Sequence, residues 1–127
     1  MKPGVLLIGT TLLTALFLAL HVADDIAHGF DTIGLHTLTA ILVLGLWLYG
    51  ALVLSGRTLG YILPLLLSIL GLGVVIIHLK SAHIGQIAVS SGGVLFVWTL
   101  LVLGTTSFMS MQLCLHGLLT LRKVQPR

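Results

Sequence analysis

The sequence contains no glutamate, and its acidic residues are three aspartates, Asp24, Asp25 and Asp31. Charged residues make up only 7% of the 127 residues, whereas a soluble domain carries about 25%. Hydrophobic residues make up 57%, and the mean hydropathy is +1.20. So few polar side chains cannot cover a surface that faces water. A water-soluble globular fold is therefore excluded, and we expect a lipid bilayer as the solvent.

Cysteine and basic residues are also scarce. The single cysteine, Cys114, excludes a disulfide within the chain. The six lysines and arginines bring the isoelectric point to about 9.5, but they are scattered at the ends of apolar stretches and form no stripe. This distribution is typical of membrane topology, and it argues against nucleic acid as a partner.

Four apolar stretches are long enough to cross a bilayer core, which takes about 20 residues per helix. They cover about residues 5–23, 35–54, 59–79 and 90–115. Short connections, such as residues 55–58, are typical of hairpins between neighbouring helices. The sequence therefore predicts an all-α fold, a polytopic integral membrane protein built as an up-and-down bundle of four transmembrane helices. We expect residues 1–127 to form a single transmembrane domain.

The basic residues indicate the orientation of this bundle. In a four-span arrangement, five of the six fall on one side of the membrane and only Lys80 falls on the other. The five are Lys2, Arg57, Arg122, Lys123 and Arg127. Because basic residues are enriched on the cytoplasmic side, we expect a multi-pass protein of the inner or plasma membrane with both termini in the cytoplasm.

In the same arrangement, the aspartates and most of the histidines fall on one side of the membrane. All three aspartates and five of the six histidines fall at the extracytoplasmic end. These histidines are His21, His28, His36, His78 and His83. Only His116 falls at the cytoplasmic end. Histidine and aspartate together are ligands for transition metals, so this end of the bundle is the candidate site.

The centre of the cluster is the segment from His21 to His28. On a helix, His21, Asp24, Asp25 and His28 occupy positions i, i+3, i+4 and i+7, which share one face within an arc of roughly 100°. One helix face then supplies several ligands, and neighbouring helices complete the coordination shell. The candidate metal ligands are His21, Asp24, Asp25, His28, His36, His78 and His83. Fe, Cu and Zn all suit such a set.

A haem is the second interpretation. Two histidines on different helices ligate a b-type haem, and His21 or His28 paired with His78 is the suitable combination. A third interpretation needs no cofactor, because polar residues near the membrane surface can face water or lipid headgroups at little cost. The sequence leaves these three interpretations open, together with a chlorophyll-type pigment, which needs only one histidine at its central magnesium ion.

Two classes of function follow from them. The first is a small membrane protein, or a subunit of a membrane oxidoreductase, whose metal or haem site serves redox chemistry or metal handling. The second is an accessory subunit of a larger membrane complex, with no cofactor and no chemistry of its own. In both classes we expect other membrane subunits or further copies of this chain as partners, and an isolated chain is not favoured as an enzyme. Proton or cation conduction along the face from Thr10 to Asp25 is a third hypothesis, but this face has no acidic residue deep in the membrane.

Overall fold

The computed structural model describes residues 3–27, 34–80, 85, 89 and 92–124. Four helices account for most of them, and this part of the chain contains no strand. The helices are α1 (Pro3–Ala27), α2 (Leu35–Leu52), α3 (Thr58–Lys80) and α5 (Gly93–Val124). The all-α class predicted from the sequence is confirmed.

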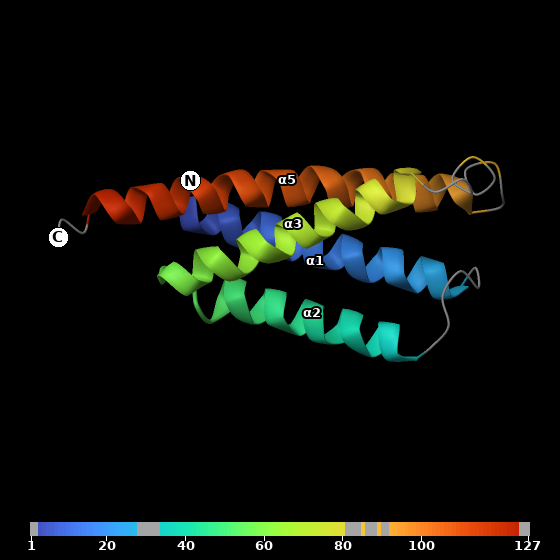
Figure 1. The fold of residues 1–127 in the computed structure, drawn as a ribbon, viewed down its shortest axis with the longest axis horizontal. Helices are drawn as coiled ribbons and strands as arrows, with labels where there is room; N and C mark the ends of the chain where they lie inside the picture. Colours follow the sequence, from blue (N-terminus) through green and yellow to red (C-terminus); the bar gives the residue numbers. More distant parts are fainter. Residues whose placement is uncertain (1–2, 28–33, 81–84, 86–88, 90–91, 125–127) are drawn as a thin grey trace.

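The helices form an up-and-down bundle (Figure 1). Each helix runs antiparallel to the next, so the start of α1 and the end of α5 lie at one end of the bundle, at the left of Figure 1. α5 packs extensively on α3 and α1, whereas α2 makes smaller contacts with α1 and α3. Within the described residues the backbones of α2 and α5 do not come close to each other, and those of α1 and α3 come close at few positions. α2 is therefore diagonal to α5 and is the least enclosed helix.

Three of the helices in the described part of the chain are long and apolar enough to cross a membrane: Gly4–Ala27, Thr58–Lys80 and Gly93–Leu121. α2 is also apolar but is shorter, at 18 residues. At 1.5 Å per residue it spans about 27 Å, just under the roughly 30 Å of a bilayer core. α5 has 32 residues and extends past the start of α1 at the left of Figure 1. The fold is thus that of a helical membrane protein.

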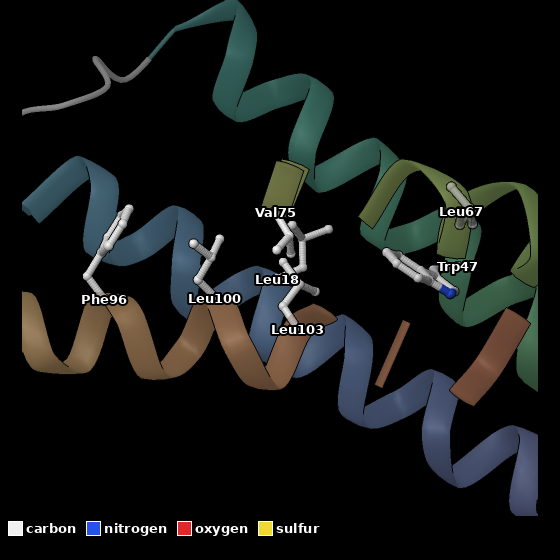
Figure 2. Close-up of a cluster of buried hydrophobic side chains, with 7 residues drawn as sticks. All are labelled: Leu18, Trp47, Leu67, Val75, Phe96, Leu100 and Leu103. Carbon is white, nitrogen blue, oxygen red and sulfur yellow. The ribbon is translucent and has the colours of Figure 1, made fainter. Parts of the chain in front are cut away.

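The apolar core receives side chains from all four helices (Figure 2). Its buried members are Leu18, Trp47, Leu67, Val75, Phe96, Leu100 and Leu103. The three members from α5 are spaced by four and then three residues, the pattern of an interhelical seam. This seam holds α5 against its neighbours and fixes which face of the helix points inward.

The same spacing continues along α5 with smaller residues, namely Ser107, Ser110, Cys114 and Gly117. Small residues let helix backbones approach closely in a membrane. At Gly117 an added Cβ would overlap the ring of Tyr61 on α3, so the position has room only for hydrogen. The Cys114 side chain is fully buried in this part of the seam.

Candidate metal centre

One face of α1 carries polar side chains into the bundle. His21 is only 1% exposed, and Thr14 and Thr10 are buried further along the same face. Both threonine hydroxyls donate hydrogen bonds to backbone oxygens one turn earlier in α1. Their polar groups are thereby satisfied within the helix. In contrast, neither ring nitrogen of His21 has a hydrogen-bond partner among the described residues.

Asp25 and His78 lie beside His21. The Nε2 atom of His21 is 3.7 Å from Oδ2 of Asp25, which is the next residue on the same face of α1. The Nε2 atom of His78, on α3, is 3.9 Å from the same oxygen. The three residues offer ligand atoms that all lie within 4.8 Å of one another. The bundle thus brings together two imidazoles and one carboxylate from two helices.

A backbone contact orients the ring of His78. Its Nδ1 atom lies 2.8 Å from the oxygen of Val74, one turn earlier in α3. Because a carbonyl oxygen only accepts hydrogen bonds, Nδ1 of the neutral ring carries the proton and Nε2 presents a lone pair to Asp25. Histidines that bind metals are commonly held in this way, with the second ring nitrogen donating to a carbonyl or carboxylate.

Phe96 of α5 covers both imidazoles. The centroid of its ring is 4.9 Å from that of His21 and 5.8 Å from that of His78. The two imidazoles themselves meet edge to face, with centroids 4.8 Å apart and an interplanar angle of 80°. Phe96 is 1% exposed, so α5 closes this side of the site with an apolar wall. Each of the three rings is therefore held by contact with the other two.

The arrangement can hold a positive charge at its centre. An ionised Asp25 presents only acceptor lone pairs, and so does Nε2 of neutral His78. Two acceptors that face each other repel unless a proton or a metal cation lies between them. Ligand atoms about 2.1 Å from a zinc ion in a tetrahedral site are about 3.4 Å from one another. The two distances to Asp25 exceed this value by about 0.3 and 0.5 Å, and all three ligand atoms lie within 4.8 Å of one another, so the imidazoles would move closer together around a zinc ion.

A pocket of about 370 Å³ adjoins the three residues on the side of α2. Its other lining residues are Leu18, Val22, Thr39, Ala40, Val43, Leu70, Gly71 and Val74. They come from α1, α2 and α3, and most of them are apolar. The polar site therefore faces α5 on one side and an apolar pocket on the other.

The structure brings together three of the seven predicted ligands, His21, Asp25 and His78. Asp24 is half-buried on α1 but is not part of this group. His36 lies in the first turn of α2, and its side chain is outside the described part of the structure. His28 and His83 also lie outside the described residues, as does Asp31.

Two features of the site were not predicted from the sequence, namely the Phe96 ring and the carbonyl of Val74. A signal for Phe96 was available in the four-and-three spacing that Phe96 shares with Leu100 and Leu103. This spacing marks the inward face of α5. The Val74 carbonyl has no sequence signal beyond lying four residues before His78.

Comparison of this chain with protein-family models, with curated proteins and with solved structures gave no match. Function must therefore be argued from the site itself.

Proposed function

We propose that the protein is a small membrane metalloprotein that binds one divalent transition metal ion through His21, Asp25 and His78. The observation that carries the proposal is the convergence of three ligand atoms, from the fully buried His21 and the partly buried Asp25 and His78, with Nδ1 of His78 held by the oxygen of Val74. Two imidazoles and one carboxylate suit zinc and ferrous iron. We further propose that both termini are cytoplasmic, which places the metal at the extracytoplasmic end.

The ring geometry favours a metal ion over a haem at this position. Two axial histidines of one haem face each other across the macrocycle. In this bundle the rings of His21 and His78 are in edge-to-face contact, and Phe96 fills the remaining side. A porphyrin between these two rings would require the helices to separate.

Three protein ligands leave a coordination position open, as in zinc and non-haem iron sites that act on a substrate. Sites that serve only structure usually have four protein ligands. We therefore place the protein in metal handling or in metal-dependent chemistry at the membrane surface. The accessory-subunit hypothesis is the alternative if no metal binds.

The test is the metal content of the full chain, purified without a histidine tag in mild detergent. Elemental analysis should find about one zinc or iron per chain, and the absorption spectrum should lack a Soret band. His21→Ala, His78→Ala and Asp25→Asn should each remove most of the metal. The double variant His21→Ala/His78→Ala should lose little more than either single variant, since ligands of one shell act as a unit.

The matched control is His116→Ala, because His116 is exposed and lies 20 residues further along α5 than Phe96, which contacts the site. It should leave the metal content unchanged. Equal metal content in all these variants would contradict the proposal, as would a metal-free wild type that also fails to bind added zinc or ferrous iron. A proton, and not a metal ion, would then hold the imidazoles of His21 and His78 beside the carboxylate of Asp25.

A further inference from the structure

The pocket beside the metal centre is polar at one end only. His21, Asp25 and His78 form that end, and they are the ionisable members among the described residues that line the pocket. Among the same described residues, Thr39 is the one other with a polar side chain, and its hydroxyl donates to the backbone oxygen of Leu35. The remaining walls are apolar. A complementary ligand therefore has an apolar body and a single polar end.

Exposed residues of two apolar helices help to line the pocket. Two lining residues, Leu70 and Thr39, are also exposed on the outer surface of α3 and α2, and the Leu70 side chain is 49% exposed. Leu70 lies in a helix that is long and apolar enough to cross a membrane, and Thr39 lies in a shorter apolar helix. A ligand that enters here must be soluble in lipid, which favours a neutral molecule over an ion.

The binding of this polar end rests on the proposed metal site. The polar end of the ligand would bind at the coordination position that the three protein ligands leave open. The three proposed ligand residues all line the pocket, so the polar end of a ligand in the pocket would lie beside them. A hydroxyl group suits this position, because its oxygen can bind the metal while its hydrogen bonds to the Asp25 carboxylate. A carbonyl has no hydrogen to donate, and a carboxylate would bring a second negative charge beside Asp25.

The net charge of the metal site further restricts the class of ligand that the pocket can bind. A divalent ion with one carboxylate and two neutral imidazoles keeps one net positive charge in an apolar environment. A hydroxyl ligand that becomes anionic on binding neutralises this charge when its proton leaves the site for the solvent, to which Asp25 and His78 are partly exposed, and metal ions lower the pKa of the hydroxyl groups that they bind. Phenols release the proton more readily than alkyl alcohols. We propose that the pocket binds a lipid-soluble phenol, the class that includes quinols, with its oxygen on the metal.

The test uses three probes that share a six-carbon tail: 4-hexylphenol, hexylbenzene and 4-hexylbenzoate. Calorimetric titration into the zinc-loaded full chain in detergent, with protein-free micelles as the blank, gives the three affinities. The phenol should bind at least about tenfold more tightly than hexylbenzene, the difference expected for one polar contact in a buried site. It should also bind more tightly than the benzoate.

Two variants of α2 locate the binding. Ala40→Phe fills the pocket, because Ala40 is half-buried in its wall, whereas Ile41→Phe adds a ring on the exposed face of the same helix. Ala40→Phe should abolish the preference for 4-hexylphenol over hexylbenzene, and Ile41→Phe should retain this preference. Zinc content, measured before any probe is added, should be the same in both variants and the wild type.

Equal affinity for phenol and hexylbenzene in the zinc-loaded wild type would overturn this inference and leave the metal site standing. So would tighter binding of the benzoate, or a preference for phenol that survives Ala40→Phe. A wild type that takes up neither zinc nor ferrous iron would overturn both the metal site and this inference.

Discussion

Nδ1 of His78 lies 2.8 Å from the backbone oxygen of Val74, and this contact sets the direction of the other ring nitrogen. We predict that neutral His78 is protonated at Nδ1 and not at Nε2, because the carbonyl can only accept. Nitrogen NMR of protein labelled at histidine, with His78→Gln to assign the signal, measures this directly. Adding zinc should shift the Nε2 signal and leave Nδ1 protonated. A ring protonated at Nε2 in the metal-free protein would contradict the proposed orientation.

Phe96 is predicted to position the metal ligands without touching the metal. Phe96→Leu removes the ring that contacts both His21 and His78 but keeps the site apolar. We expect the zinc affinity to fall by about tenfold, the lower end of the range for residues that orient metal ligands. The number of ions bound per chain should not change. Phe108→Leu is the control, because Phe108 is 50% exposed on the same helix.

The contact of Gly117 with Tyr61 predicts a strong dependence of stability on side-chain size. Gly117→Ala should lower the free energy of unfolding by about 1–3 kcal/mol, because the new methyl group overlaps the Tyr61 ring. Gly104→Ala, which meets Val75 at an ordinary 3.4 Å, should be neutral or stabilising. Titration with a denaturing detergent measures both. The loss at Gly117 should shrink in a Tyr61→Ala background, and an equal loss there would disprove the overlap.

The orientation of the bundle is predicted from the distribution of basic residues. A fluorescent protein that folds only in the cytoplasm should fluoresce when fused after Arg127 or inserted at Arg57. It should stay dark at Asp31 or Ser81, on the opposite side. Fluorescence at Asp31 would reverse the orientation and move the metal centre to the cytoplasmic end.

Composition was sufficient to predict the fold class. A chain with 7% charged residues and four apolar stretches has few alternatives to a helical membrane bundle, and the structure confirms this class. Composition did not predict that α2 is short and encloses little of the bundle. That property depends on how the helices cross, which the packing of side chains determines.

The site was predictable where helical spacing alone decides it. His21 and Asp25 are four residues apart, so any helix brings them together. Asp24 is about 100° away from Asp25 around the helix, and only packing determines which of the two points at a neighbouring helix. The choice of His78 as the ligand from another helix likewise depends on the face that α3 turns inward. That face is set by contacts such as Gly71 with Ser107 and Trp47.

The only thiol of the protein is completely enclosed in the seam of α5. In the native bundle Cys114 should therefore resist thiol-reactive reagents, and it becomes reactive only when α5 separates from the helices packed on it. The rate of its modification consequently reports the opening of the bundle, with no label or added residue. A bound metal ion that joins α1 to α3 would slow this rate, so one native atom reports on both assembly and metal binding.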